Sequence, residues 1–345
     1  MTVLPRLLGL ATAVPPHILY QSRVREESAG FFGREGAHLL PVFDNAGIEK
    51  RHSAMPIEWY LEAHGWAERN DAYLATAVPL VEEVALAALA QAKLSPEDID
   101  AIVIVSNSGV ATPSLDARLM ARLPFRRHTV RLPIFGLGCA GGVLGLSRAT
   151  ALARAEPGSR VLLLVVELSS LSFRKADSSK SNIVATALFA DGAAAAIVST
   201  HGEGPALGPS GEHCWPDTLG IMGWDIADDG MKAIFSRDIP SLIRRELRSV
   251  VDAFLQRKAL DFTDFDRFVC HPGGMKVIAA LEEVFERPAG SMIETRDVLR
   301  QYGNMSAATV LFVLKATLET DPGSRMLLVS MGPGFSVAFQ ALDNR

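Results

Sequence analysis

The sequence predicts a layered α/β protein whose two halves resemble each other. Short runs rich in Val and Ile alternate with longer segments of helical periodicity, the pattern of a sheet covered by helices. The same local pattern also occurs twice: an apolar strand runs into GCAGG and a helix in the first half, and into CHPGG and a helix in the second. Each half therefore carries a reactive side chain at a strand-to-helix turn, where glycines allow close backbone approach.

The individual elements follow in order. The apolar start, MTVLPRLLGLATAVPPH, is broken by Pro5 and Arg6, which favours a first buried strand over a signal peptide. Further buried strands are predicted at residues 101–106, 161–167, 193–199, 267–271, 326–331 and 336–341. Helices are predicted at about 75–92, 114–122, 140–155, 240–258, 274–286 and 306–320.

Residues 200–218 divide the chain. They carry Gly, Pro and polar residues without periodicity, which makes them the most linker-like stretch. We therefore expect an N-terminal half at residues 1–200, which holds a candidate nucleophile, and a C-terminal half at residues 201–345.

Composition excludes several classes of function. The chain has 345 residues, 48% hydrophobic and 21% charged, as expected of a compact enzyme with a large core. A net charge of −5 argues against broad nucleic-acid binding. Three cysteines without a CxxC pair and eight scattered histidines predict neither a disulfide framework nor a metal site. The longest apolar runs, such as 161–168, are too short for a membrane span, so we expect a cytoplasmic protein.

Cys139 is the candidate nucleophile. It follows the strand-like LPIFGLG and begins a helix, whose free N–H groups and positive dipole end stabilise a thiolate, the form that attacks a carbonyl. Glycines flank it on both sides, and core packing does not require so many. Cys214, in the linker-like stretch, and Cys270, at the end of an apolar strand, are expected to be inert.

Two further side chains complete a site for carbon–carbon condensation. His271 in VCHPGG and Asn304 in YGNMSAAT each lie at an element junction beside a glycine. A histidine near Cys139 keeps the thiolate ionised, and the cysteine can then carry an acyl group as a thioester. N–H donors of His271 and Asn304 can stabilise the enolate formed when a malonyl carboxylate leaves as carbon dioxide. Singly, a helix cap and a turn residue explain them, but their joint occurrence favours acyl transfer.

Five ordered motifs carry a resemblance over essentially the whole chain. LGCAGG, LFADGAAA, HPGG, GNMSAA and MGPGF resemble type III polyketide synthases, the chalcone synthase-like branch of the thiolase fold. The resemblance implies two similar αβαβα halves in a five-layered core, a homodimer, acyl-CoA and malonyl-CoA as substrates, and no bound cofactor. By motif, it implies that Cys139 accepts the acyl group, and that His271 and Asn304 polarise the malonyl-CoA thioester and bind the enolate oxygen.

The resemblance extends to residues around the cavity. Phe189 in LFADG matches the gatekeeper phenylalanine between CoA tunnel and reaction cavity, although a core phenylalanine would be the simpler reading without the other motifs. A second gatekeeper phenylalanine of plant chalcone synthases is matched by Ala233, and loss of a ring there opens space for several methylenes. Thr112 is expected to reach the neighbouring subunit's site. The remaining matches are cavity-lining Ser169 and Ser172 and a structural loop of Gly332, Pro333 and Gly334.

The phosphates of CoA require cations. Lys50 and Arg51 fall where the family has a basic cluster near the tunnel mouth, and Lys276 follows HPGG closely enough to serve similarly. A solvated surface charge explains each of the three equally well.

Longer stretches resemble one bacterial group. KRHSAMPIEWY, TPSLDARLMARLPF and MGWDIADDGMKAIFSRDIP resemble the alkylpyrone and alkylresorcinol synthases, which take medium or long fatty acyl-CoA starters. We therefore expect a fatty acyl starter on Cys139, two or three malonyl extensions, and cyclisation to an alkylpyrone or alkylresorcinol. Burial of each starter methylene in an apolar tunnel contributes about 0.8 kcal/mol.

Three other functions share parts of this pattern. A ketoacyl-ACP synthase III-like priming enzyme would make a single condensation, but its histidine motif usually reads HQAN rather than HPGG. A papain-like hydrolase has Cys, His and Asn in the same order, but an aromatic residue follows its cysteine where this chain has Ala140-Gly141-Gly142. A catalytically silent scaffold would not need the three catalytic residue types, and all three are present.

Overall fold

The structure, a computed structural model, describes residues 3–321 and 323–345. Its strands are β1 (Arg6–Ala13), β2 (His17–Tyr20), β3 (Lys50–Ser53), β4 (Ala101–Val105), β5 (Val130–Ile134), β6 (Arg160–Leu168), β7 (Asp191–Ser199), β8 (Ala206–Cys214), β9 (Met222–Ala227), β10 (Gly230–Phe235), β11 (Arg267–Cys270), β12 (Arg325–Gly332) and β13 (Ser336–Asp343). Its α-helices are α1 (Gln21–Gly36), α2 (Pro41–Asp44), α3 (Ile57–Tyr60), α4 (Trp66–Ala92), α5 (Leu115–Met120), α6 (Gly141–Ala155), α7 (Lys180–Leu188), α8 (Ile239–Leu242), α9 (Arg248–Arg257), α10 (Met275–Val284), α11 (Ile293–Tyr302) and α12 (Thr309–Thr320). Short helical turns are η1 (Ala37–Leu39), η2 (Pro96–Asp98), η3 (Gly138–Ala140), η4 (Ser169–Ser172), the π-helical η5 (Ile243–Leu247), η6 (Phe262–Asp264) and η7 (Ser306–Ala308).

The central sheet consists of two parts. Its strand order is β11-β12-β13-β8-β1-β7-β6-β4-β5, which places strands of the second half at one end and strands of the first half at the other. The two parts meet where β1 pairs with β8, and this contact consists of the single pair Arg6 and Ala206. Two small sheets, β2 with β3 and β9 with β10, lie outside this order.

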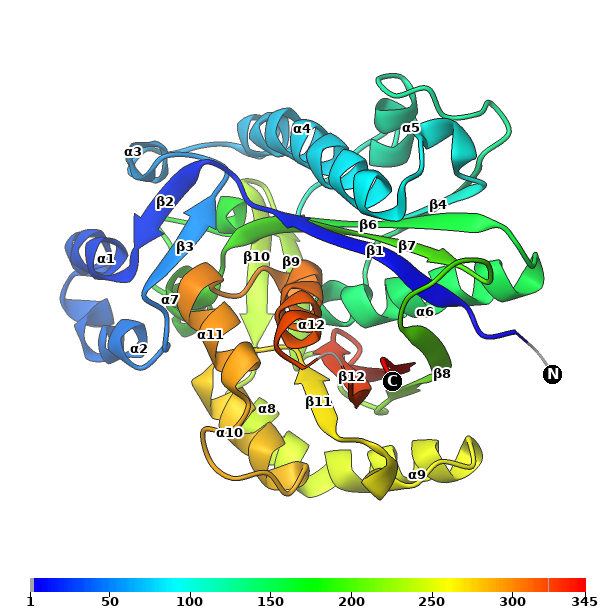
Figure 1. The fold of residues 1–345 in the computed structure, drawn as a ribbon. Coiled ribbons are helices and arrows are strands. Elements are labelled where there is room, and N and C mark those ends of the chain that lie inside the picture. Colours follow the sequence, from blue (N-terminus) through cyan, green and yellow to red (C-terminus); the bar gives the residue numbers. More distant parts are fainter. Residues whose placement is uncertain (1–2, 322) are drawn as a thin grey trace.

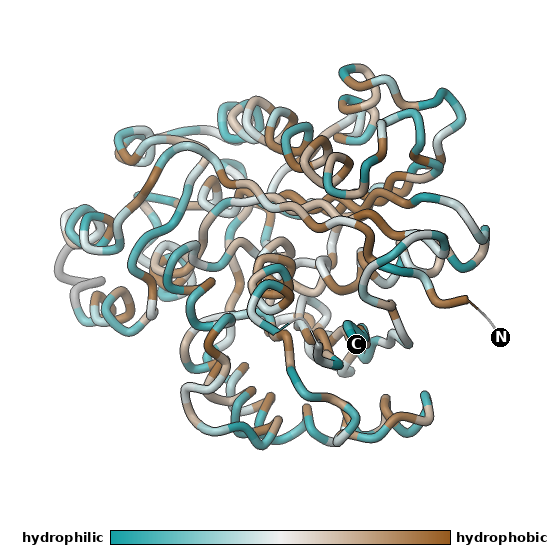
Figure 2. The backbone as a smooth tube through the Cα atoms, in the orientation of Figure 1, coloured by the Kyte–Doolittle hydropathy of each residue, from teal (hydrophilic) through white to brown (hydrophobic). Residues whose placement is uncertain are grey.

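Helices and the two sheet parts are stacked in five layers (Figure 1), and the side chains of each strand alternate between the two layers beside it. On β6, Leu163 faces the inner helices α6 and α12, and Leu164 faces the outer helix α4. On β12, Leu328 faces the same inner helices, and Leu327 faces the outer helices α9 and α10. Hydrophobic colouring accordingly gathers along the central strands in Figure 2. The thiolase-like α/β architecture with a five-layered core is confirmed.

The two inner helices approach each other closely at their N-terminal ends. A Cβ atom added to Gly142 of α6 would lie 2.2 Å from the carbonyl oxygen of Ala307, immediately before α12. A Cβ on Gly141 would lie 2.7 Å from Val105 of β4. Glycine is therefore needed at Gly142, where a side chain would push apart the two helix starts that carry the candidate site, and a side chain at Gly141 would press on β4.

Helix α4 is long and apolar enough, by length and composition alone, to cross a membrane. Its apolar face is the outer cover of the first sheet part, where Leu80, Val84 and Leu89 are buried against the strands. The core helix of a globular domain explains these properties.

The predicted strands are confirmed to within about two residues at their ends. Among the helices, α4 begins at Trp66 rather than 75, and the segment predicted at 240–258 contains the π-helical turn η5. The linker-like interpretation of residues 200–218 is wrong for 206–214, because these residues form β8, which pairs with β13 along its length. Glycine and proline hide this strand from pattern analysis. The division at residue 200 stays a prediction.

Candidate active site

Cys139 lies in the turn η3, directly before the inner helix α6, and is 6% exposed. The turn is tight: Gly138 has a φ of +48°, and a Cβ there would lie 2.4 Å from the ring of Pro333. A Cβ on Gly332 would lie 2.8 Å from that of Ala140. The loop at Gly332, Pro333 and Gly334 thus packs directly against the turn that carries the candidate nucleophile.

Asn304 lies before the turn η7, at the start of the second inner helix. Its Oδ1 accepts a hydrogen bond from the backbone N–H of Ser306 at 2.9 Å. The thiol of Cys139 donates to the hydroxyl of Ser306 at 3.5 Å. Ser306 therefore links the two helix starts, and the Nδ2 hydrogens of Asn304 are left as donors for a substrate.

His271 directly follows β11, one strand away from the Cys139 turn. Its backbone N–H donates to the carbonyl of Val329 on β12 at 2.9 Å. Ser330, which follows Val329 on β12, donates its hydroxyl to the carbonyl of Cys139 at 2.5 Å. Side chains alternate on β11: Val269 faces the inner layer and Cys270 the outer one, so His271 is directed to the inner layer that holds Cys139. Both ring nitrogens are buried without a hydrogen-bond partner among the described residues.

Burial opposes the charged forms of both side chains. It raises the pKa of the Cys139 thiol to about 12, although the hydrogen bond to Ser306 favours ionisation. It also lowers the pKa of His271 to about 3. Burial therefore opposes the thiolate that the helix start and a nearby histidine are expected to stabilise, and the ionisation of Cys139 stays a prediction. A proton passing from sulfur to imidazole creates two opposite charges together, and each then stabilises the other.

Glu167, near the C-terminal end of β6, is a buried acidic residue beside the loop before Cys139 that sequence reasoning missed. It is completely buried, and its carboxylate accepts hydrogen bonds from Asn107 N at 3.0 Å and Nδ2 at 2.6 Å. Asn107 Oδ1 in turn accepts from the N–H of Gly136, in the loop before Cys139, at 2.7 Å. Burial raises the pKa of Glu167 to about 7. The signal was available, because an acidic residue interrupts the otherwise apolar run VLLLVVEL.

Phe189 and Ala233 lie in one small cluster, although they are distant in sequence. Phe189 directly follows α7, and its ring centroid lies 5.7 Å from that of Trp224 and 5.3 Å from that of Phe235. Ala233 is 6% exposed in the same cluster. The backbone of Phe189 also bridges that of Asn304. The aromatic cluster, in which Ala233 contributes only a methyl group, therefore lies next to the segment that holds Asn304.

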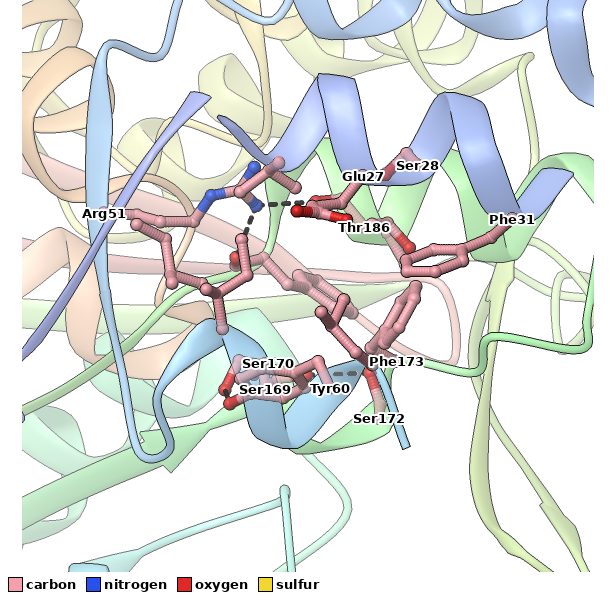
Figure 3. A pocket seen from close by; sticks show the side chains of 16 residues that line it. Glu27, Ser28, Phe31, Arg51, Tyr60, Ser169, Ser170, Ser172, Phe173 and Thr186 are labelled. Atoms are coloured by element: carbon pink, nitrogen blue, oxygen red, sulfur yellow. Dashed lines mark hydrogen bonds between the residues drawn. The ribbon is translucent and has the colours of Figure 1, made fainter. Parts of the chain in front are cut away.

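An apolar cavity lies beside this cluster, among α1, α3, η4 and α7 (Figure 3). It holds about 520 Å³ of empty space, part of which is open to solvent. Ser169 and Ser172 line it, as do the rings of Phe31, Tyr60 and Phe173. Ser172 donates its hydroxyl to the carbonyl of Ser169 at 2.7 Å, whereas the hydroxyl of Ser169 has no partner among the described residues.

Thr112 lies away from these residues. It is exposed, and it lines an open hollow beside the edge strand β5 together with the exposed Val110 and Phe135. Its expected contact with a neighbouring subunit stays a prediction.

The three cations expected at the CoA phosphates have different surroundings. Lys276 is exposed near the start of α10, and Lys50 is half-buried on β3. Arg51 is 2% exposed and donates to the backbone carbonyls of Thr186 at 2.7 Å and Phe189 at 2.8 Å. The expectation for Arg51 is therefore corrected, because a guanidinium held in this way does not reach a phosphate at the surface.

The chain is similar to known proteins in both sequence and structure. Family models described as the N-terminal and C-terminal domains of chalcone and stilbene synthases match residues 4–202 and 208–340. A 1,3,6,8-tetrahydroxynaphthalene synthase of Streptomyces peucetius subsp. caesius is 38% identical, with 99% of this chain and 94% of that protein aligned. One of the same name from Streptomyces griseus is 32% identical, with 94% and 89% aligned. The crystal structure of the Streptomyces coelicolor A3(2) tetrahydroxynaphthalene synthase, a bacterial type III polyketide synthase, superposes with a TM-score of 0.94 at 28% identity and covers 99% of both chains.

Proposed function

The chain belongs to the chalcone and stilbene synthase family of type III polyketide synthases, and on that premise we propose that Cys139, His271 and Asn304 form its condensing site. Members of this family are decarboxylating acyltransferases that use acyl-CoA and malonyl-CoA. The observation that carries the assignment is the shared inner layer: two helix starts linked through Ser306 hold Cys139 and Asn304, and His271 is directed to the same layer.

In the loading step, the sulfur of Cys139 attacks the thioester carbonyl of the starter. The thiol proton passes to a ring nitrogen of His271, which burial keeps neutral and able to accept it. The carbon–sulfur bond to CoA then breaks, and the CoA thiolate takes the proton as it leaves. The product of this step is a thioester on Cys139.

In the extension step, malonyl-CoA loses its carboxylate as carbon dioxide. The electron pair of the broken bond forms an enolate, whose oxygen accepts hydrogen bonds from Asn304 Nδ2 and His271. The enolate carbon attacks the thioester on Cys139, and the new carbon–carbon bond releases the sulfur. Both ring nitrogens of His271 are without a partner among the described residues, and Asn304 is held through its Oδ1, so both side chains are suited to donate to an oxygen that gains charge in the transition state.

We propose a medium or long fatty acyl-CoA as the starter and an alkylpyrone or alkylresorcinol as the product. Ala233 leaves room in the cluster around Phe189, and the adjoining cavity has mainly apolar walls. Because each buried methylene contributes about 0.8 kcal/mol, a chain of several methylenes would bind far better than acetyl.

A starter panel tests this proposal. The enzyme is incubated with labelled malonyl-CoA and starters from acetyl to stearoyl, and the products are identified by mass spectrometry. The proposal predicts that kcat/KM rises with chain length, and that Ala233→Phe removes the preference for long chains while short starters still react. Equal use of acetyl or benzoyl starters would count against a fatty acyl substrate.

A second candidate product is a small polyhydroxylated aromatic. It is favoured by the relatives named for 1,3,6,8-tetrahydroxynaphthalene, whose ten ring carbons correspond to five two-carbon units and need no alkyl starter. Malonyl-CoA supplied alone separates the two candidates, because only this second one forms an aromatic product without a starter.

The remaining features of the proposal concern binding and assembly. We propose that Lys50 and Lys276 bind the CoA phosphates. A homodimer is typical of the family, and we propose that Thr112 completes the partner's site in such a dimer, in the cytoplasm. Family membership also favours this function over the ACP-dependent priming enzyme, the hydrolase and the silent scaffold.

A further inference from the structure

The C-terminal end of α7 is capped by buried side chains from other elements, and we propose that Arg51 is a positioning residue that holds Phe189 and Asn304 through this cap. The inference rests on the proposed function, because it concerns the same site. It also gives a role to Arg51, which is buried and does not reach the CoA phosphates.

The last carbonyls of a helix have no partner within the helix, so other groups must satisfy them. At the end of α7, Nη1 of Arg51 donates to the carbonyl of Thr186 at 2.7 Å and to that of Phe189 at 2.8 Å. Between them, the carbonyl of Ala187 accepts from Nε2 of Gln21 at 3.0 Å. Arg51 also donates through Nη2 to the side-chain oxygen of Gln21. The two side chains therefore act as one cap (Arg51 and Thr186 are labelled in Figure 3).

Asn304 is attached to the same helix end. Its backbone N–H donates to the carbonyl of Leu188 at 2.9 Å, and its own carbonyl accepts from the N–H of Ala190 at 2.9 Å. These two hydrogen bonds bracket Phe189. The Asn304 backbone thus cannot shift without moving the segment that Arg51 holds.

Packing reinforces this connection at Gly303. This glycine has a φ of +71°, and a Cβ added to it would lie 3.3 Å from the Cβ of Arg51 and 3.2 Å from the carbonyl oxygen of Leu188. The residue before Asn304 therefore lies directly between the Arg51 strand and the end of α7. A shift of Arg51 acts on Asn304 through contact as well as through hydrogen bonds.

Electrostatics explains why an arginine is used. The C-terminal end of a helix carries partial negative charge, so a cation is favourable there. Burial lowers the pKa of Arg51 to about 10, against the opposing effect of the Asp191 carboxylate, so the guanidinium remains charged at neutral pH. Its planar group presents donors in several fixed directions, which the single ammonium of lysine does not reproduce.

The test separates two half-reactions in purified full-length enzyme. Acylation of Cys139 by acyl-CoA is measured by intact-protein mass spectrometry, and decarboxylation of malonyl-CoA without starter is measured by carbon dioxide release. For Arg51→Met we expect kcat of decarboxylation to fall about 100-fold, because displacement of an oxyanion donor by about 1 Å has an effect of that size. We expect acylation and the KM for malonyl-CoA to change little.

Three further variants make the test sharper. Arg51→Lys keeps the charge but loses the several donor directions, so we expect an intermediate loss of decarboxylation. Gln21→Met removes the neighbouring donor, and we expect a smaller loss in the same half-reaction. Arg300→Met is the matched control, because Arg300 is an exposed arginine that pairs with Glu49 and Asp297, and we expect no change in either half-reaction.

Two outcomes would overturn the inference. An equal loss of acylation and decarboxylation in Arg51→Lys and Gln21→Met would mean that the cap serves stability alone. A raised KM with unchanged kcat and a weaker dependence on salt would mean that Arg51 binds CoA phosphates after all. Failure of wild-type enzyme to decarboxylate malonyl-CoA is a different result, which would contradict the proposed function itself.

Discussion

At the scale of single residues, the site holds polar groups where burial is costly. Cys139, His271 and Asn304 are 6%, 3% and 2% exposed, and the ring nitrogens of His271 have no partner among the described residues. A buried donor without a partner costs about 1–3 kcal/mol. Hydrogen bonds from these donors to a substrate oxygen remove that cost. Such an arrangement suits a pocket that must bind a developing enolate.

Replacement of Asn304 by Ala tests this role. Loss of one oxyanion donor lowers kcat by about 100-fold to 1,000-fold in enzymes of this kind, and we expect that loss in malonyl-CoA decarboxylation. Acylation of Cys139 should persist, because loading does not use this donor. The control is Asn45→Ala, which removes an exposed amide bonded to Pro41. Normal decarboxylation in Asn304→Ala would contradict the assignment.

Glu167 predicts a pH dependence of stability. Burial raises its pKa from 4.5 to about 7 in the folded protein. Between pH 4.5 and 7, Glu167 is ionised in the unfolded chain and still protonated in the folded protein. Its contribution to the free energy of unfolding is therefore full below pH 4.5 and is lost as the pH rises towards 7. The loss amounts to about 3 kcal/mol.

Chemical unfolding of wild-type protein and Glu167→Gln across this pH range measures the effect. Asp191, whose pKa burial raises to about 6, titrates in both proteins, so the difference between their free energies of unfolding reports Glu167 together with its charge repulsion from Asp191. We expect the variant to gain relative to wild type as the pH rises. A pH-independent difference would mean that Glu167 is already ionised in the folded state at low pH.

At the scale of elements, the chemistry depends on the short distance between the N-terminal ends of the two inner helices, α6 and α12. Cys139 precedes α6 and Asn304 precedes η7 and α12, and Ser306 joins them by hydrogen bonds. The glycines of GCAGG are thus needed for the approach of two helices, in addition to the turn itself. A side chain at Gly142 would press on the backbone of Ala307, which has no flexible end to move.

Gly142→Ala should therefore lower the free energy of unfolding by about 1–3 kcal/mol, as overpacking does, and should also reduce activity by separating Cys139 from Asn304. The matched control is Gly30→Ala in α1, where a Cβ meets no described residue within 4 Å. There we expect a gain of about 0.5–1 kcal/mol, because glycine is costly inside a helix. Thermal unfolding of both variants checks the pair, and unchanged stability in Gly142→Ala would contradict the close approach.

At the scale of the whole molecule, the two halves share their inner layer. Both α6 and α12 are buried between the two sheet parts, so each half covers a surface of the other. Separately produced fragments 1–200 and 201–345 would each expose one apolar sheet face. We expect neither fragment to unfold cooperatively alone, whereas the intact chain unfolds in one transition. Cooperative unfolding of a single fragment, observed by circular dichroism, would show that the halves are independent.

Much of this architecture could be predicted from the sequence, because buried strands are continuous apolar runs. The segments 161–167 and 326–331 have this form, and both are confirmed as central strands. The strand β8 could not be recognised, because it lies at the junction of the sheet parts and contains Gly and Pro. The helix α11 was missed as well, since its sequence is polar overall and Val298 and Leu299 are its only large apolar side chains that are buried among the described residues.

For the site, pattern and motif located Cys139, His271 and Asn304, each at the start or end of an element that the fold directs to the inner layer. Arg51 shows what pattern cannot give. An arginine beside a lysine suggests a surface cluster, and only tertiary packing reveals that it is buried at the end of a helix 135 residues away in sequence. Ionisation is likewise a tertiary property, since burial raises the pKa of Cys139 and lowers that of His271, and burial depends on the packing of distant segments.

The central claim is that Cys139 carries the growing chain, and the most direct measurement is peptide mass spectrometry after incubation with fatty acyl-CoA alone. We predict one acyl group, on the peptide that contains Cys139, and its disappearance with release of product when malonyl-CoA is added. Acylation of Cys214 or Cys270 instead, or product formation by Cys139→Ala, would contradict the account.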